Sequence, residues 1–163
     1  MTQNKFITKI RDKINPFLIK FELHILFVIL LVIGIKLFVL EFPDMLFAVI
    51  MFMAAIIYFI SSLIENKDLL INGLDIFIYK LTGMASSVAI VGLLFLVLKS
   101  PGYHEMIFVG ASSLLITLIY IFWKRNKGDN TSLFYNSLII RILVLILSSG
   151  ALLIMVNNSV FSQ

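Results

Sequence analysis

The sequence predicts an all-α membrane protein, and three observations carry that prediction. Of its 163 residues 61% are apolar and only 13% are charged, and the mean hydropathy is +1.08. A soluble domain of this length would be about half apolar and about a quarter charged. The apolar residues are also gathered into runs close to the roughly 20 residues that cross a bilayer. Because unpaired backbone groups cannot face hydrocarbon, each run should form an α-helix.

Five apolar runs predict five transmembrane helices. They lie at residues 23–40, 45–64, 81–98, 106–123 and 138–156. The third helix begins nearer Gly73 if Asp75 and Lys80 lie at the level of the lipid headgroups. The predicted architecture is therefore a bundle with an odd number of crossings.

Two proline-containing turns divide the runs into hairpins. Pro43 and Pro101 disfavour helical geometry in the residue before each of them, so a helix should end at each site. Short connections make sequence neighbours antiparallel in space. The chain then reads as a basic interfacial segment, a hairpin, a cytoplasmic or interfacial loop, a second hairpin, a basic cytoplasmic loop, a fifth helix and an external tail. Their bounds are 1–21, 22–64, 65–80, 81–123, 124–136, 137–157 and 158–163.

The distribution of basic residues predicts the orientation of the helices. Of the 13 lysine and arginine residues, only Lys36 and Lys99 fall on the side that holds the two proline turns. The others precede the first helix, lie in the second and fourth loops, or lie one turn into the fifth helix. Basic residues near helix ends favour the cytoplasmic side. We therefore expect a multi-pass protein of the bacterial inner membrane, with a cytoplasmic N-terminus and an external C-terminus.

The first 21 residues have the pattern of an amphipathic helix in the inner headgroup layer. Its apolar face carries Phe6, Ile10, Ile14, Phe17 and Phe21. Its basic face is expected to contact lipid headgroups through Lys5, Lys9, Arg11 and Lys13. Each basic residue near anionic lipid contributes roughly 1 kcal/mol. The alternative is a solvated basic tail that serves only as a topology signal. No small-residue cleavage site follows, so the segment is expected to be a retained anchor.

Two stretches at the predicted outer ends of the first and third helices can be aligned. Residues 34–43 read GIKLFVLEFP, and residues 92–101 read GLLFLVLKSP. Both run from a glycine to a proline, and a valine and a leucine also coincide. The alignment predicts an internal repeat of two parallel hairpins related by an axis along the membrane normal, with the fifth helix as an unpaired addition.

Each aligned stretch joins a glycine, an apolar helix end and a proline-containing turn, and a second apolar helix follows. This pattern resembles the transmembrane hairpin of the L-type stator subunit of the gliding-motility and type 9 secretion motor, and of its small relatives. The similarity covers about residues 34–59 and 92–123. It implies the hairpin architecture. The resemblance would also imply a buried lysine after the glycine and a carboxylate in the second helix. Phe38 and Leu96 stand at the lysine positions, and neither second helix holds a carboxylate, so ion-driven activity is not carried over.

Ionisable residues within the apolar runs are candidates for function, because a charge at the centre of a membrane helix costs about 2.5–3.5 kcal/mol on insertion scales. Lys36 lies in the outer third of the first helix, and its stem can carry the ammonium outward toward Glu41 and Asp44. A paired polar site is the alternative to such snorkelling. Arg141, near the inner end of the fifth helix, is expected to snorkel in the same way.

Six polar residues near the predicted outer ends of the helices form a candidate site, which we call the outer rim. It consists of Lys36, Glu41, Asp44, Lys99, His104 and Glu105. If the two hairpins pack side by side, these residues converge into a polar vestibule or a docking patch for an external partner. The alternative is a rim of solvated side chains.

Small residues at helical spacing predict where the helices approach one another most closely in lipid. They are Gly34, Ala85, Ala89, Gly92, Gly110, Ser113, Thr117, Ser148 and Ala151. The third, fourth and fifth helices are therefore expected to pack most tightly. The second helix is expected to face lipid or a partner subunit with its large side chains, Phe47, Met51, Phe52, Met53 and Phe59.

The sequence offers little chemistry for catalysis or metal binding. It contains no cysteine, and His24 and His104 fall on opposite sides of the predicted membrane, so neither a metal site nor a cofactor is expected. Serine pairs recur in four of the predicted helices without a histidine nearby, so their hydroxyls should bond to the backbone of the preceding turn or across helices. The net charge of +4 accompanies too little polar surface for a nucleic-acid partner. We expect no enzymatic activity.

Two functional hypotheses follow. The first is a non-enzymatic integral membrane subunit that contributes helices to a larger inner-membrane assembly. Its partners would be the lipid bilayer and other membrane subunits or further copies of itself, and the stator resemblance adds secretion or motility as the context. The second is a small oligomeric channel or transporter for an ion or small solute, with Lys36, Glu41 and Asp75 along its path.

Overall fold

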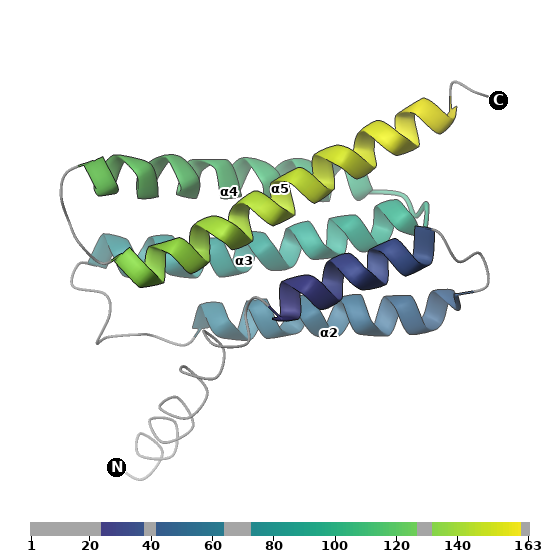
Figure 1. Cartoon of the computed structure of the whole chain (residues 1–163), viewed down its shortest axis with the longest axis horizontal. Helices are drawn as coiled ribbons and strands as arrows, with labels where there is room; N and C mark the ends of the chain where they lie inside the picture. Colours follow the sequence, from purple (N-terminus) through teal and green to yellow (C-terminus); the bar gives the residue numbers. More distant parts are fainter. Residues whose placement is uncertain (1–23, 38–41, 64–72, 127–131, 161–163) are drawn as a thin grey trace, which may run out of the picture.

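The structure is a computed structural model that describes residues 24–37, 42–63, 73–126 and 132–160. Outside these residues lie the predicted headgroup contacts and one member of the outer rim, namely Lys5, Lys9, Arg11, Lys13 and Glu41. Every regular element in the described part of the chain is an α-helix, which confirms the predicted all-α class (Figure 1).

The described residues form five helices. They are the helix His24–Leu37, α2 (Asp44–Leu63), α3 (Gly73–Val97), α4 (Tyr103–Asn126) and α5 (Ser132–Val160). The helices α2 to α5 are long and apolar enough to cross a membrane. Over its described residues the helix His24–Leu37 is apolar and about 20 Å long at 1.5 Å per residue, which is shorter than a hydrocarbon core of about 30 Å. Four of the five predicted spans therefore have the required length and composition.

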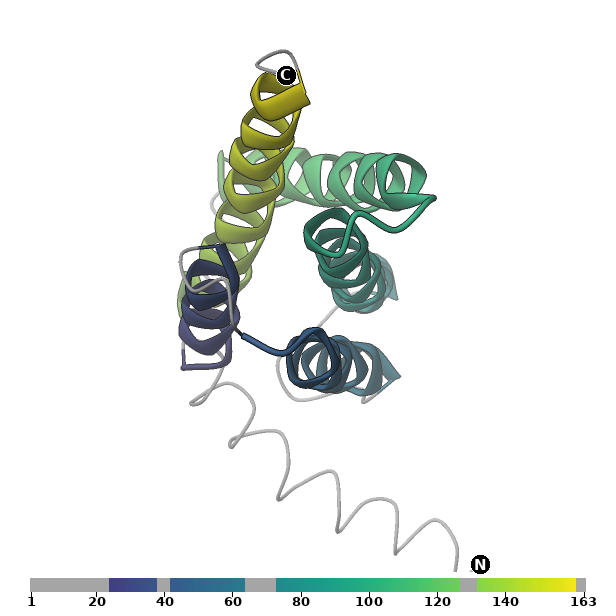
Figure 2. The same ribbon diagram turned by 90° about the vertical axis from the view of Figure 1, so that its right-hand side faces the viewer.

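The helices alternate in direction along the bundle (Figure 1). The start of α2 and the turn at residues 98–102 lie at one end, which we call the turn end. The end of α2, the start of α3 and the end of α4 lie at the opposite end, which we call the loop end. The view along the bundle places α3 between α2 and α4, with α5 running obliquely and the helix His24–Leu37 on the same side of α3 as α5 (Figure 2).

The helix α3 starts at Gly73, the earlier of the two starts considered from the sequence. The stretch 65–80, predicted as a loop, therefore includes the first two turns of α3. The predicted loop at 124–136 likewise contains the last turn of α4 and the first residues of α5. The helices α3 and α4 extend beyond the apolar runs because Asp75 at the start of one contacts Lys124 at the end of the other.

The turn between α3 and α4 shows how a helix ends without a glycine at the usual position. Lys99 has a φ of 53° and its N–H donates to the carbonyl of Leu96, while the N–H of Ser100 donates to the carbonyl of Phe95. This pair of bonds is a Schellman motif, which satisfies carbonyls that the helix end leaves without partners. Pro101 follows and prevents the helix from resuming, as the sequence predicts.

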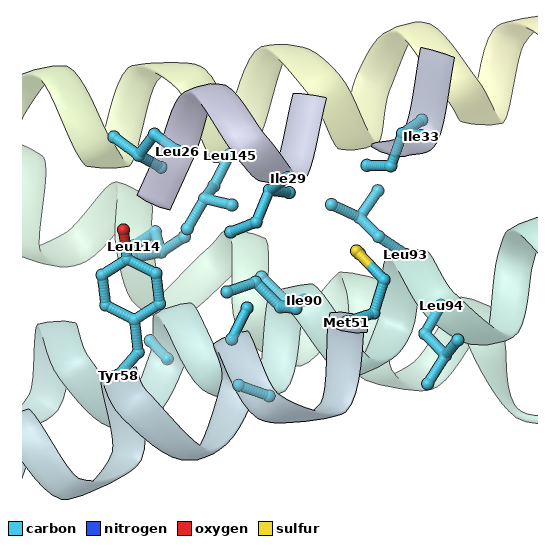
Figure 3. Packing of buried hydrophobic residues seen from close by; sticks show 14 of the residues in the cluster. Leu26, Ile29, Ile33, Met51, Tyr58, Ile90, Leu93, Leu94, Leu114 and Leu145 are labelled. Atoms are coloured by element: carbon cyan, nitrogen blue, oxygen red, sulfur yellow. The ribbon is translucent and has the colours of Figure 1, made fainter. Parts of the chain in front are cut away.

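The core lies where the helices face one another, and all five contribute to it (Figure 3). Ile90 and Leu93 of α3 are completely buried at its centre. The short helix points Leu26, Ile29 and Ile33 into the same core, so it belongs to the bundle even though it is shorter than the others.

Glycines and alanines bring α3 very close to its two neighbours. A Cβ atom added at Gly110 of α4 would lie 2.8 Å from the backbone nitrogen of Ala89, and one added at Gly83 would lie 2.6 Å from the Cβ of Ser62 on α2. A Cβ added at Gly92 would lie 2.8 Å from Ile107 Cγ1. Close approach of this kind is the usual basis of helix association in lipid.

The packing corrects two of the sequence predictions. The most extensive helix contacts join α3 to α4 and α2 to α3, whereas α5 makes fewer, so α5 does not share the tightest packing. Phe47 and Met51 of α2 are completely buried instead of facing lipid. The reason is a face of small residues on α2, including Ala55 and Ser62, that lets this helix lie against α3.

Candidate functional site

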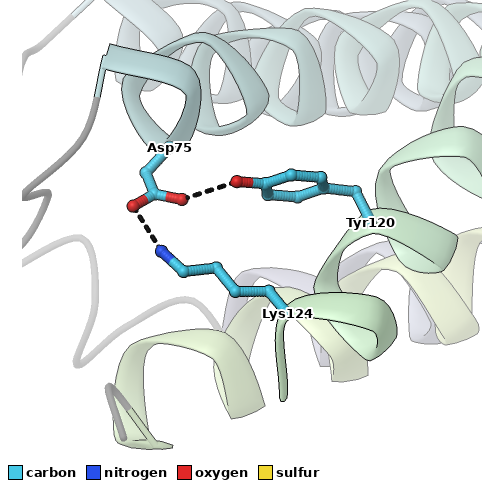
Figure 4. A network of polar contacts seen from close by, with 3 residues as sticks. All are labelled: Asp75, Tyr120 and Lys124. Atoms are coloured by element: carbon cyan, nitrogen blue, oxygen red, sulfur yellow. Dashed lines mark hydrogen bonds and ion pairs between the residues drawn. The ribbon is translucent and has the colours of Figure 1, made fainter. Parts of the chain in front are cut away.

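A buried carboxylate near the loop end is the most unusual polar feature of the bundle. Asp75 is the third residue of α3 and is only 4% exposed. Its Oδ2 lies 2.5 Å from the ammonium of Lys124, and its Oδ1 accepts a hydrogen bond of 3.0 Å from the hydroxyl of Tyr120 (Figure 4). We call Asp75, Tyr120 and Lys124 the Asp75 network.

Local sequence and helix geometry together position the Asp75 network. Tyr120 and Lys124 are four residues apart on α4, so they lie on the same face, one turn apart. Asp75 stands in the first turn of α3, where a negative charge interacts favourably with the helix dipole. Because α3 and α4 are antiparallel neighbours, the start of one meets the end of the other.

The Asp75 network neutralises its own charge and links two helices. The carboxylate has a cationic partner on one oxygen and a phenol on the other, so its burial is compensated by charge-assisted hydrogen bonds. Breaking a buried pair by removing one partner leaves an uncompensated charge, which is strongly destabilising. The network therefore acts as a clamp between the start of α3 and the end of α4.

The sequence predictions did not identify this network. They placed Lys124 in a cytoplasmic loop, and Asp75 at the level of the lipid headgroups or on the path of a hypothetical channel. The signal that was present is the pair Tyr120 and Lys124 at i and i+4 near the end of one hairpin helix, opposite a carboxylate near the start of the other. Antiparallel pairing of these two helices is enough to bring the three residues together.

Arg141 makes a second buried polar contact, between α5 and α2. Its guanidinium carbon lies 5.0 Å from the centroid of the Tyr58 ring, and the residue is only 3% exposed. The prediction that Arg141 snorkels to the membrane surface is therefore wrong. Arg141 shares a face of α5 with Leu138, Ile142 and Leu145, which points into the core, and a guanidinium over an aromatic face gains a cation–π attraction.

Lys36 extends toward Asp44, as the sequence predicts. Its ammonium lies 2.5 Å from Asp44 Oδ1 and donates to the backbone carbonyl of Phe42 at 2.5 Å. Asp44 itself is largely exposed at the start of α2. The contact is therefore a staple between the short helix and α2 at the turn end.

The remaining described members of the outer rim lie around the start of α4. Lys99 is exposed in the α3–α4 turn, and the ring of His104 lies 4.0 Å from that of its neighbour Tyr103. Glu105 is exposed one residue further along. Within the described helices and turns, no ion pair joins this group to Lys36 and Asp44. The convergence of all six rim residues stays a prediction.

The residues predicted to mediate helix packing differ in their burial. Five of them are buried residues of α3 or α4, namely Ala85, Ala89, Gly92, Gly110 and Thr117. Ser113 and Ser148 are half-buried, and Ala151 is exposed. Gly34 has open space where a Cβ would be, whereas Gly92, its counterpart in the aligned stretches, is in close contact. The two aligned glycines therefore have different surroundings.

Hydroxyl groups inside the helices bond to their own backbone, as the sequence predicts. Ser62 donates to the carbonyl of Phe59 at 2.6 Å, and Ser86 donates to that of Thr82 at 2.7 Å. Residues with the same type of bond to a carbonyl three or four positions earlier are Ser61, Thr82, Ser112, Thr117, Ser148 and Ser149. These hydroxyls are thus satisfied within their helices, which suits a lipid surrounding.

Comparisons with known proteins leave the physical features of the chain as the basis for function. No protein family, curated protein or solved structure matches it. Among the described residues, no group of three or more histidine, aspartate or glutamate side chains is arranged to hold a metal ion. The features that remain are the Asp75 network, the Lys36 staple and the apolar outer faces of the helices.

Proposed function

We propose that this protein is a non-enzymatic integral membrane subunit that contributes helices to a larger inner-membrane assembly. The observation that carries the proposal has two parts: internal hydroxyls and the Asp75 carboxylate bond within the bundle, and large apolar side chains lie on its outside. On α4 the outward side chains include Ile116, Ile119 and Phe122. On α2 they include Phe52, Met53 and Phe59, three of the residues expected from the sequence to face lipid or a partner.

The distribution of surface supports a role inside the membrane. Only residues 42–43 and 98–102 of the described chain lie between helices, so the surface outside lipid is small there. The internal hydroxyls and the Asp75 carboxylate already have partners within the bundle. Within the described residues the outward helix faces are therefore the main surface available for binding, and the resemblance to a motor stator hairpin agrees with such a role.

The assembly can be tested by native mass measurement and crosslinking. Because the chain contains no cysteine, a thiol-reactive photo-crosslinker can be attached at one introduced position. We expect Ile119→Cys, on the exposed face of α4, to crosslink to another membrane protein or to a second copy. The matched control is Ile121→Cys, which is buried on the same helix. A protein that elutes as an 18.5 kDa monomer without partners, and gives no specific crosslink at Ile119→Cys, would contradict the proposal.

The same absence of cysteine allows a test of the proposed orientation, with the loop end in the cytoplasm. We expect Pro101→Cys, in the exposed α3–α4 turn, to react with a membrane-impermeant maleimide added to intact cells or spheroplasts. Asn126→Cys, exposed at the end of α4, should react only after permeabilisation. The reason is that basic residues near helix ends are retained on the cytoplasmic side. The reverse labelling pattern would invert the topology.

A channel or transporter is the second candidate, favoured by the Asp75 network. An ionisable side chain buried in a membrane helix is a functional candidate by default. This candidate requires ion or solute flux in liposomes above the level of protein-free liposomes, lowered by Asp75→Asn or Lys36→Ala. The subunit proposal expects flux at the protein-free level in the original chain and in both variants. Flux that depends on either residue would replace the first proposal with the second.

A further inference from the structure

A groove between α4 and α5 is not used by the proposed function. It lies toward the turn end, where α5 diverges from α4 (Figures 1 and 2). Its volume is about 530 Å³, and about 930 Å³ when the space at its open edge is included. The residues that matter for its chemistry are Phe108, Ala111, Leu115, Leu153 and, at the polar end, His104 and Glu105.

The lining of the α4/α5 groove favours hydrocarbon over water. Its walls are apolar apart from the end that holds His104 and Glu105, and the hydroxyl of Ser112 already donates to the carbonyl of Val109. An apolar cavity does not hold ordered water, since water needs two to four polar partners. Leaving the groove empty would forfeit dispersion contacts along its walls. At the depth of a membrane helix, an acyl chain is the hydrocarbon at hand.

The dimensions of the groove favour an acyl chain over a partner helix. From His104 to Leu115 it follows α4 for about 17 Å at 1.5 Å per residue. Even its larger volume then corresponds to a cross-section of about 55 Å², whereas a helix with a diameter of about 10 Å needs about 80 Å². A partner helix can therefore lie over the groove but does not fit within it.

The polar end of the groove indicates the class of headgroup. Glu105 is exposed in the first turn of α4 and presents a carboxylate, which accepts hydrogen bonds from a primary ammonium but finds no N–H donor on a quaternary one. His104, also exposed, offers a ring N–H to a phosphate oxygen. We propose that the α4/α5 groove binds one acyl chain of a phospholipid whose primary ammonium headgroup contacts Glu105.

Native mass spectrometry of the purified full chain tests this proposal. The probes are dioleoyl phosphatidylethanolamine and, for comparison, dioleoyl phosphatidylcholine and dioleoyl phosphatidylglycerol, each titrated into the protein in mild detergent. We expect one retained phosphatidylethanolamine, bound about tenfold more tightly than either competitor, a ratio that corresponds to about 1.4 kcal/mol. Glu105→Gln should remove this preference, and because the side chain is exposed the variant should fold normally.

Filling the groove tests the acyl-chain part separately. Ala111→Phe should abolish retention of all three lipids, while Ile116→Phe, an exposed position outside the groove on the same helix, should leave retention unchanged. Thermal unfolding of both variants shows whether they are folded. If Ala111→Phe does not fold, the loss of lipid preference in Glu105→Gln still tests the proposal. Equal retention of the three lipids would overturn the headgroup assignment. Retention of lipid by folded Ala111→Phe would overturn the site. The site would also be overturned if Ala111→Phe lost a bound second copy of the chain and no bound lipid. These outcomes do not depend on the crosslinking result at Ile119.

Discussion

Asp75→Ala is expected to lower the free energy of unfolding by about 3 kcal/mol or more, as for other buried ion pairs that lose one partner. The substitution leaves the ammonium of Lys124 and the hydroxyl of Tyr120 without the carboxylate that both now contact. Both side chains come from α4, so the contact between the start of α3 and the end of α4 should loosen first. Unfolding by heat or by denaturing detergent in mild micelles measures the loss.

Two control variants distinguish the charge from the shape of the Asp75 network. The double variant Asp75→Ala with Lys124→Met removes both charges and should be more stable than Asp75→Ala alone, since the buried ammonium that lost the Asp75 carboxylate is removed as well. Tyr120→Phe removes only the hydroxyl that donates to Asp75 and should cost about 1 kcal/mol. Lys124→Met alone completes the comparison. If the stability lost in the double variant equals the sum of the losses in Asp75→Ala and Lys124→Met, the two residues act independently and the network does not work as a clamp.

Gly110→Ala is expected to destabilise the protein by about 1–3 kcal/mol, although alanine is the better helix former. The new Cβ would lie 2.8 Å from the backbone nitrogen and 2.9 Å from the Cα of Ala89. Backbone atoms cannot rotate away as a side chain can, so α3 and α4 must separate. The same unfolding measurement in mild micelles reports the effect.

Gly150→Ala is the matched control, because a Cβ at Gly150 of α5 meets no atom within 4 Å. Helix propensity then acts alone, and this variant should be neutral or up to about 1 kcal/mol more stable than the original chain. The two substitutions are chemically identical and should have opposite signs. A loss of stability as large in Gly150→Ala as in Gly110→Ala would show that the contact between α4 and Ala89 is not what disfavours alanine at position 110.

The helical elements follow from local sequence. Length, apolar content and the need to satisfy backbone groups in lipid determine that the chain forms helices of this size. Pro43 and Pro101 mark two of the connections between successive helices. The bonds of hydroxyls such as Ser62 and Ser86 to preceding carbonyls are equally local. The contact of Lys36 with Asp44 spans a short turn, so the sequence could also predict it.

The facing of the helices does not follow from local sequence. The pattern on α2 predicts one surface that faces lipid or a partner subunit, but Phe47 and Met51 turn inward while Phe52 and Met53 turn outward. All four side chains are apolar, and lipid is as apolar as the core, so hydrophobicity alone cannot tell the two faces apart. Only the position of α3, close against Ser62, decides which face is buried.

The sequence by itself determined that this chain is helical, apolar enough to cross a membrane and polar mainly at its helix ends, because these properties depend on residues that are neighbours along the chain. The tertiary structure alone decided the Asp75 network, the inward direction of Arg141 and the α4/α5 groove. Tyr120 and Lys124 lie 45 and 49 residues from Asp75, so their contact depends on how two helices pair. The pairing of α3 with α4 depends on which small residues let the two helix backbones approach each other, and only the packed bundle shows which residues these are.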